Sequence, residues 1–587
     1  MGDLDAFDGD EDAALRYAIA LSLQDGGNNS SEHPIELSSD EDENDLEKAP
    51  KHPSTTKEPR KSSFEEPVKD ASMRDEPGVF QQPAPAAPGS FAALGLDRKK
   101  MEEERLARLR KRKLTESEPE QQERRQKLKL DSETPVNSGV KDVPPNLPYP
   151  KGIVKKTWAA GSPRGDDIKI EEVLQKNELE LAVISSFQWD DLWMLSKIDF
   201  SRTKVVCIAF ALDKAQQEEI KANAPQGAKV RFCFPPMGPT GNMHSKLQLL
   251  KFPGYLRVVV PTGNFVPYDW GENGVIENMV FLIDLPRFDD ARLQPSDNLG
   301  PFGDELSYFL RAQGLDETLV SSLKNYDFSE ANRYRFIHSI GTSHVGDKWQ
   351  RTGYCGLGRA VKSLGLDTTE DIEVDFVVSS LGSVNMDLVS AIYYAAQGDN
   401  GMKEYEARTA KGARNKGPTQ AKVDLKNNFR IYFPSRDTVI QSRGGRNAGG
   451  TICVQSKWWD SATFPRELIR DCKSIRPGLL IHAKLMMVRH FHSGKSKAAY
   501  GYVGSANLSE SAWGRLVKER GTGNPKLTCR NWECGVIVPI CSQVSSGDGS
   551  QQSDQSNPHN IIPVPVKIPG EPYGATKSKR PWLFLED

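Results

Sequence analysis

An internal repeat is the feature that most constrains how this chain folds. The first copy reads HSKLQLLKF, a turn, LRVVVPTGNF and DW, and the second reads HAKLMMVRHF, a polar loop, YGYVGSANL and AW. His244 precedes Asn264 by twenty residues and His482 precedes Asn507 by twenty-five, and the HSGKSK turn (492–497) absorbs the difference. Each copy therefore predicts two strands joined by a turn, the second ending near a glycine and an asparagine.

Apolar runs separated by turns predict further strands between residue 147 and the end of the chain. They read VVCIAFAL (205–212), KVRFCF (229–234), LRVVV (256–260), MVFLIDL (279–285), IEVDFVVSS (372–380), FRIYF (429–433), GTICV (450–454), LLIHAKLMMV (479–488) and WECGVIV (532–538). Amphipathic stretches such as 385–396 lie between them, so the pattern predicts an α/β fold. We expect two similar domains, 147–331 and 332–587, each a mixed sheet flanked by helices, with both repeat copies facing one pseudo-two-fold cleft.

Each repeat copy opens with a His-x-Lys motif. In a strand, residues i and i+2 share a face, so His244 projects with Lys246 and His482 with Lys484. Lysine is rarely buried without a partner, and the pairs make sense if an anion binds between them. One copy alone is weak evidence and more consistent with an ordinary core strand, whereas two matching copies favour chemistry.

A phosphodiester is the anion that this set of side chains suits. Lys246 and Lys484 would bind the phosphoryl oxygens, and the amides of Asn264 and Asn507 could donate to the remaining ones. One histidine would attack phosphorus to form a phosphohistidine, and the other would protonate the leaving oxygen and then activate water. The sequence alone leaves open which histidine has which role. This chemistry needs neither metal nor cofactor, and the eight cysteines form no C-x-x-C pair.

Charge is unevenly distributed along the chain. Residues 1–50 hold fifteen Asp and Glu against two basic residues, so the remainder carries a net charge of +10 although the whole chain is at −3. A basic body suits contact with phosphate, and a merely solubilising acidic tail is an equal alternative. The acidic start has no signal-peptide core and no apolar run approaches a membrane span, which predicts a soluble intracellular protein without membrane partners.

The two motifs resemble those of the phospholipase D superfamily. Most members carry an aspartate five residues after the lysine, where this chain has Lys251 and Arg489. Loss of both aspartates resembles the tyrosyl-DNA phosphodiesterase branch, type one. Further segments similar to that branch are SSLGS (379–383), GSANLSESAWG (504–514), WECGVIVP (532–539) and the PYG…RPW ending (572–582). Because the chain ends soon after RPW, one expectation is that a final family segment is missing.

The resemblance implies an enzyme that frees a DNA 3′ end, single-stranded or nicked, from the tyrosine of a stalled topoisomerase I, leaving a 3′-phosphate. It implies that His244 is the nucleophile and His482 the general acid and base. Glu533 matches a carboxylate that orients the nucleophile. For the residue that orients His482, the sequence offers Glu277 or Asn278, and we favour Asn278.

The resemblance also implies residues that contact DNA. Ser380, Ser383 and Ser509 match serines that bind backbone phosphates, and Trp189 matches an aromatic near the peptide or DNA path; ordinary turn hydrogen bonds are the alternative for the serines. Two positions depart from the family, which can carry a basic residue at 510 and an aromatic residue at 240, and here have Glu510 and Thr240. Basic segments 403–422 and 442–450 either line the DNA side or form solvated loops.

The amino-terminal 146 residues are expected to form an arm that precedes the two catalytic domains. Residues 1–25 predict a helix, one face of which resembles a ubiquitin-interacting motif. That face holds Leu15, Ala18, Ile19 and Ser22. The alternative interpretation is a generic amphipathic helix. Residues 26–146 predict a disordered arm. Within it, 34–45 resembles a SUMO-interacting motif, or is an acidic linker with chance apolar residues. Basic clusters 105–114 and 124–130 predict nuclear localisation or a DNA-binding arm.

We therefore expect a monomeric, nuclear DNA repair phosphodiesterase. Two alternatives remain: another phosphodiesterase or nuclease of the superfamily, and an inactive scaffold that binds DNA ends and ubiquitin. The absence of membrane signals argues against a lipid substrate, and the intact His244, Lys246, His482 and Lys484 argue against a scaffold.

Overall fold

The computed structural model describes residues 147–211, 213–224, 229–238, 240–288, 298–410, 425–492, 495–540, 562–573 and 579–583. These residues belong to one compact unit. The whole predicted arm lies outside them, including the predicted ubiquitin-interacting helix, the segment that resembles a SUMO-interacting motif and the basic clusters. Among the described residues, no helix is long and apolar enough to cross a membrane.

The first sheet is built from the strands between Ile153 and Pro286. Its order is β2-β1-β10-β8-β7-β3-β4-β5. The bounds are β2 Asp167–Ile168, β1 Ile153–Thr157, β10 Met279–Pro286, β8 Tyr255–Pro261, β7 Gln248–Lys251, β3 Leu181–Ser185, β4 Lys204–Ile208 and β5 Val230–Cys233. The β10, β8, β7 and β3 strands are successively antiparallel, and β3, β4 and β5 are parallel, so the sheet is mixed as predicted.

The second sheet repeats the topology of the first from β1 to β5, and β2 has no counterpart in its strand order. Its order is β11-β23-β20-β19-β13-β15-β17. The bounds are β11 Arg335–Ser339, β23 Asn531–Pro539, β20 Lys495–Gly504, β19 Lys484–His492, β13 Ile372–Val377, β15 Phe429–Phe433 and β17 Ile469–Asp471. The β23, β20, β19 and β13 strands are antiparallel in turn, and β13, β15 and β17 are parallel. The hairpin β7–β8 thus corresponds to β19–β20, which is the repeat that the sequence predicted.

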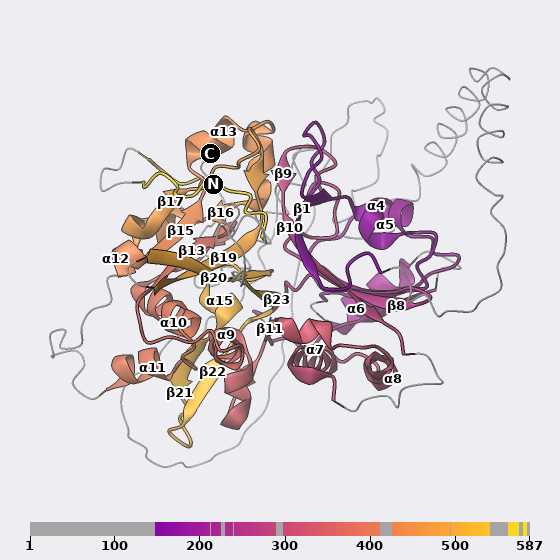
Figure 1. Ribbon diagram of the computed structural model, residues 1–587, viewed down its shortest axis with the longest axis horizontal. Helices are drawn as coiled ribbons and strands as arrows, with labels where there is room; N and C mark the ends of the chain where they lie inside the picture. The colour runs from indigo at the N-terminus through magenta and orange to yellow at the C-terminus, as the bar shows by residue number, and fades with distance from the viewer. Residues whose placement is uncertain are drawn as a thin grey trace, which may run out of the picture. The chain divides into compact units, whose positions relative to one another are not determined.

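The two sheets pack face to face through one shared apolar core. Alternate residues of β8 serve different cores, because Val258 and Val260 face the second sheet whereas Val259 faces outward, as the two-residue period of a strand requires. The outer side of the first sheet is covered by α4 (Ile170–Leu174) and α5 (Asp191–Lys197). Figure 1 shows the two halves, coloured indigo to magenta and orange.

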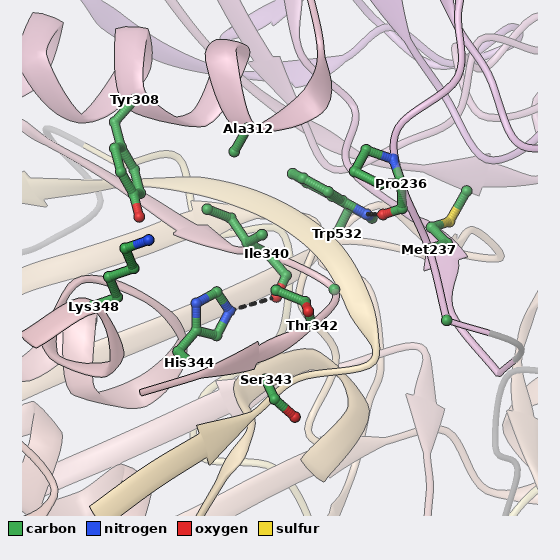
Figure 2. Close-up of a pocket in the computed structure, with 12 residues that line it drawn as sticks. Pro236, Met237, Tyr308, Ala312, Ile340, Thr342, Ser343, His344, Lys348 and Trp532 are labelled. Atoms are coloured by element: carbon green, nitrogen blue, oxygen red, sulfur yellow. Dashed lines mark hydrogen bonds between the residues drawn. The ribbon is translucent and has the colours of Figure 1, made fainter. Parts of the chain in front are cut away.

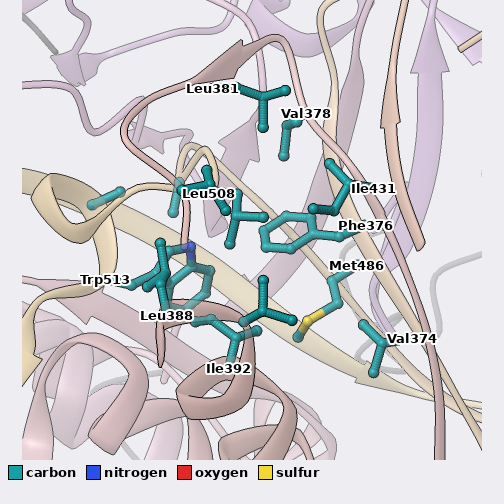
Figure 3. Close-up of a cluster of buried hydrophobic side chains, with 14 of the residues drawn as sticks. Val374, Phe376, Val378, Leu381, Leu388, Ile392, Ile431, Met486, Leu508 and Trp513 are labelled. Carbon is teal, nitrogen blue, oxygen red and sulfur yellow. The ribbon is translucent and has the colours of Figure 1, made fainter. Parts of the chain in front are cut away.

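The outer face of the second sheet is covered by helices α9 (Gly353–Ser363) and α10 (Met386–Ala396). Helix α10 begins where Asn385 caps it by accepting from the Leu388 amide, and its apolar stripe then faces the sheet. Figure 3 shows this contact, with α10 side chains against those of β13, β15 and β19. Helix α7 (Gly300–Gln313) packs against the core that the two sheets share.

The two halves also exchange short strands, and each exchange occurs next to a predicted catalytic histidine. Strand β6 (Asn242–Met243) pairs with β23 of the second sheet, and β18 (Leu480–Ile481) pairs with β9 (Ile276–Glu277) of the first half. The peptide N–H of His244 then donates to the Trp532 carbonyl, and that of His482 donates to the Glu277 carbonyl, both at 3.0 Å.

These exchanges correct one detail of the sequence prediction. His244 and Lys246 lie between β6 and β7 rather than within a strand, and His482 lies just before β19, whose first residue is Lys484. The reason is that the short strand before each histidine pairs with a strand of the other half, and the chain then crosses to the sheet of its own half. Each histidine therefore stands at the junction of the two halves.

Candidate active site

One pocket collects the predicted residues from both repeat copies. It is lined by Phe187, Gln188, His244, Asn264, Ser379, Ser380, Thr451, His482 and Asn507. Each half contributes one histidine and one asparagine, as the predicted pseudo-two-fold cleft requires. Residues brought there by the fold but not expected from the sequence are Phe187, Gln188, Ser379 and Thr451.

The imidazole of His244 is held by a carboxylate from the other half. Its Nδ1 lies 2.9 Å from Oε2 of Glu533, the contact that the resemblance implied. Ser505 donates to the same carboxylate, and the Asn531 amide donates to its second oxygen at 3.1 Å. With Nδ1 engaged, Nε2 is the ring nitrogen that remains for a substrate.

His482 also lies beside a carboxylate from the other half, that of Asp269 and not the Asn278 amide, although this contact is an ion pair without the hydrogen-bond alignment of His244 and Glu533. Nδ1 of His482 lies 2.9 Å from Oδ1 of Asp269, whose carboxylate is fully buried. The Asn278 amide donates to that same oxygen at 3.0 Å, and the Asn264 peptide N–H donates to the other at 2.6 Å. The preference for Asn278 as the direct partner was therefore wrong, because Asn278 orients the carboxylate and the carboxylate orients the histidine.

The alternative partner, Glu277, does not contact the imidazole with its side chain. Its carboxylate pairs with Arg476 and Ser474, and only its backbone carbonyl reaches His482. A signal for Asp269 was present in the sequence, since it is the acid of the DW pair five residues after Asn264. Spacing alone could not show that this acid would face a histidine from the other half.

The two lysines are buried beneath the histidines. Lys246 donates to the His244 carbonyl at 2.8 Å, and Lys484 donates to the His482 carbonyl at 2.7 Å and lies 3.1 Å from Nε2 of His482. Burial, with repulsion from Lys246, lowers the pKa of Lys484 well below its usual range. An anion in the pocket would relieve this repulsion, which is what a phosphodiester would supply.

Electrostatics set the protonation of the histidines. Burial lowers the pKa of His244, and it lowers the pKa of His482 to about 4 although Asp269 acts in the opposite direction. Burial would raise the pKa of Asp269, but His482 and Lys484 outweigh it and lower that pKa to about 2. These shifts favour two neutral imidazoles beside two ionised carboxylates, and a phosphodiester in the pocket would favour protonation of His482.

The asparagines and one hydroxyl show unused hydrogen-bonding capacity. Oδ1 of Asn507 accepts from the Ser379 and Ser380 peptide N–H groups, so its amide NH₂ remains available for a ligand. Within the described chain, Oδ1 of Asn264 and Oγ1 of Thr451 are buried without a partner. The Thr451 hydroxyl could donate to a phosphoryl oxygen, whereas Oδ1 of Asn264 can only accept; the Asn264 amide N–H₂ donates one hydrogen bond to Gln188 at 3.2 Å and has a second N–H for a ligand.

The predicted DNA-contacting residues lie at differing positions around this pocket. Ser380 lines it, whereas Ser509 caps helix α15 (Glu510–Trp513) by accepting from the Ala512 amide. Ser383 is exposed shortly before α10, and Trp189 is half-buried against Phe265, next to two lining residues. Their contacts with DNA stay predictions.

Positions that depart from the family are engaged in other contacts. Lys251 pairs with Glu180 at 2.8 Å, and Arg489 pairs with Glu373 at 3.0 Å. Glu510 accepts from Arg515 at 2.7 Å, and Thr240 is exposed. Neither cation at the former aspartate positions lines the pocket, so their presence leaves its chemistry intact.

A second, larger pocket lies on the other side of β23 and does not carry this chemistry. Figure 2 shows it between α7, the 340–344 loop and the 236–238 segment, with the Trp532 indole donating to the Pro236 carbonyl. Its one histidine, His344, is engaged with the Ile340 carbonyl, and burial lowers its pKa. Among the described residues that line this pocket there is no carboxylate, in contrast to the paired histidines and acids of the first.

Two repeated sheets with a His-x-Lys motif from each, meeting in one pocket, define a phosphodiesterase of the phospholipase D type. Among the described residues, no group of three or more His, Cys, Asp or Glu side chains is placed to hold a metal ion. The family model described as tyrosyl-DNA phosphodiesterase matches residues 153–574. The chain belongs to the tyrosyl-DNA phosphodiesterase family, which confirms the resemblance drawn from the motifs.

Individual relatives agree with this assignment. The chain is 24% identical to tyrosyl-DNA phosphodiesterase 1 of Arabidopsis thaliana over 71% of each protein. It is also 24% identical to a probable tyrosyl-DNA phosphodiesterase of Caenorhabditis elegans, over 58% of this chain and 67% of the relative. The crystal structure of the yeast tyrosyl-DNA phosphodiesterase shares the fold, with a TM-score of 0.52 at 16% identity, covering 74% of this chain and 99% of that one.

Proposed function

We propose that this protein hydrolyses the phosphodiester between a DNA 3′ end and the tyrosine of a topoisomerase I peptide. The observation that carries the proposal is the reciprocal pairing in the pocket. Each half supplies one histidine and the carboxylate that orients the other half's histidine, His244 with Glu533 and His482 with Asp269. Two imidazoles, each with Nδ1 beside a carboxylate and with a buried lysine near it, suit in-line displacement at phosphorus.

The first step forms a covalent intermediate. Nε2 of His244 attacks phosphorus and the bond from phosphorus to the tyrosyl oxygen breaks. His482 gives its proton to that oxygen, so the peptide leaves as neutral tyrosine. Lys246, Lys484 and the amides of Asn264 and Asn507 would stabilise the charge on the phosphoryl oxygens.

The second step releases the DNA. His482, now neutral, takes a proton from water as the water attacks phosphorus, and the bond from phosphorus to His244 breaks. The products are a DNA 3′-phosphate and regenerated imidazoles. His482 thus acts twice, and the Asp269 carboxylate stabilises its protonated form each time.

A single assay tests the proposal. The purified protein should convert a single-stranded oligonucleotide carrying 3′-phosphotyrosine to the 3′-phosphate in EDTA, as followed by mass spectrometry. Absence of product would refute the proposed activity. A requirement for an added divalent metal would point to a different nuclease chemistry.

Asp269→Asn should reveal the acid role of His482 in a pH profile. Loss of the Asp269 carboxylate lowers the pKa of His482 further. A smaller fraction of His482 is then protonated at any pH above that pKa. At neutral pH, kcat/KM for the tyrosyl substrate should fall about 10- to 100-fold, since each unit of pKa corresponds to ~1.4 kcal/mol. The loss should lessen as the pH is lowered.

A substrate with a better leaving group is the control for this variant. An oligonucleotide 3′-(4-nitrophenyl phosphate) needs little protonation of its leaving oxygen, so Asp269→Asn should affect its cleavage much less. Equal losses on both substrates at every pH would show that Asp269 only maintains the structure.

Roles outside the pocket are proposed on the sequence alone. The segments that resemble ubiquitin-interacting and SUMO-interacting motifs would bring the protein to modified partners, and the basic clusters would direct it to the nucleus. Monomeric action, and the DNA contacts of Trp189, Ser380, Ser383 and Ser509, belong to the same proposal.

A further inference from the structure

A buried ion pair joins the two halves beside the second histidine. Nε of Arg476 donates to Oε2 of Glu277 at 2.6 Å, and the Ser474 hydroxyl donates to the other oxygen. Arg476 also donates to the Thr157 carbonyl at 2.8 Å. The Glu277 side chain is fully buried and that of Arg476 is 13% exposed. Burying a carboxylate without such a partner is costly, and even a paired buried carboxylate adds little stability, so a role other than stability would explain why this ion pair is present.

Glu277 reaches His482 along two routes. Through the backbone, β9 pairs with β18, and the Glu277 carbonyl accepts from the His482 peptide N–H at 3.0 Å. Through side chains, the next residue, Asn278, donates to Asp269 at 3.0 Å, and Asp269 lies 2.9 Å from Nδ1 of His482. The ion pair therefore anchors both the main chain and the carboxylate that fix the imidazole.

The junction at the first histidine is built differently. There β6 meets β23 with Asn242 opposite Asn531, and Asn531 donates to Glu533 at 3.1 Å. In the register of each junction, Trp532 is the counterpart of Glu277, because the Trp532 carbonyl accepts from the His244 peptide N–H as the Glu277 carbonyl accepts from that of His482. An indole thus stands at the first junction where an ion-paired carboxylate stands at the second. An ionic anchor at His482 fits its double task, because it must meet first the tyrosyl oxygen and then a water molecule.

We propose that Arg476 and Glu277 are positioning residues for His482, and that their ion pair sets the rate at which the covalent intermediate is hydrolysed. The inference rests on the proposed function. Loosening His482 should slow both steps, but the second more. The tyrosyl leaving group has a pKa of about 10, whereas water, at about 15.7, depends far more on an aligned base. Intermediate should then accumulate on His244.

The test compares two isosteric changes in the full chain. Glu277→Gln breaks the anchor, and Asp284→Asn weakens a fully buried ion pair, Arg257 with Asp284 at 2.7 Å, in the first sheet away from both histidines. Each variant is mixed with the 3′-phosphotyrosyl oligonucleotide, the reaction is quenched during turnover, and the mass of the intact protein is measured by mass spectrometry. Glu277→Gln should lose about 10- to 100-fold in kcat, by analogy with second-layer mutations at metal sites, with little change in KM, and should carry the DNA adduct. Asp284→Asn should lower the melting temperature without an adduct.

Two Arg476 variants keep the test decisive if Glu277→Gln does not fold. Arg476→Met should accumulate adduct, and Arg476→Lys should recover part of the hydrolysis rate because it restores the charge. Adduct levels in these variants equal to those of Asp284→Asn or of the unaltered protein would overturn the inference. An unaltered protein without turnover, together with no adduct in His482→Ala, would instead refute the proposed function on which it rests.

Discussion

His482→Ala should lower turnover of a 3′-phosphotyrosyl oligonucleotide by about 10²–10⁴-fold, the range expected for a lost general acid and base. The protein that remains should carry DNA covalently bound to His244. The reason is that tyrosine can leave, slowly, without protonation, whereas the phosphohistidine awaits a water that no residue deprotonates. The adduct should be seen by intact mass and should be labile to acid.

The position of the adduct decides the division of roles. His490→Ala is the matched control, because His490 lies in β19 beyond Lys484 and outside the pocket, and it should leave turnover unchanged. Peptide mapping of the trapped protein should find the DNA on His244. An adduct on His482 in the unaltered protein would reverse the assignment that the resemblance implied.

His244→Ala should abolish both turnover and adduct. Removing a covalent nucleophile costs up to about 10⁶-fold in kcat in a serine protease, and a loss of at least about 10⁴-fold is expected here. Gel shift on the intact substrate should still show binding, since Lys246, Lys484 and the asparagines remain. Residual cleavage near the unaltered rate would mean that water attacks phosphorus directly.

The double variant provides an internal check on this pair. His244→Ala with His482→Ala should be no slower than His244→Ala alone, because the two histidines act in one sequence of steps and their effects do not add. It should also lose the adduct that His482→Ala accumulates. A persistent adduct in the double variant would identify another nucleophile.

Most of the strands were predictable because their residues alternate or run continuously apolar. MVFLIDL became β10, FRIYF became β15 and NMDLVSAIYYAA became α10 with its Asn385 cap. The predicted strand 450–454 was shorter, since residues through Thr451 form a 3₁₀ helix and only Cys453–Val454 pair. Glycines 449 and 450 in that segment favour a turn over a strand.

The catalytic set was predictable where the repeat marked it and not elsewhere. His244, Lys246, Asn264 and their counterparts follow from the spacing of two copies. Asp269 was missed, although it lies five residues after Asn264, because its partner comes from the other half. Thr451 and Gln188 reach the pocket from segments without a motif.

The sequence by itself determined that two copies of a His-x-Lys unit exist, that each begins a strand hairpin, and that their chemistry suits a phosphodiester. It could do so because side-chain type and spacing are local properties of the chain. Only the tertiary structure decided which carboxylate faces which histidine. The exchange of β6 and β18 between the halves brings Glu533 to His244 and Asp269 to His482. Such pairings arise from packing between residues distant in sequence, and no spacing along the chain encodes them.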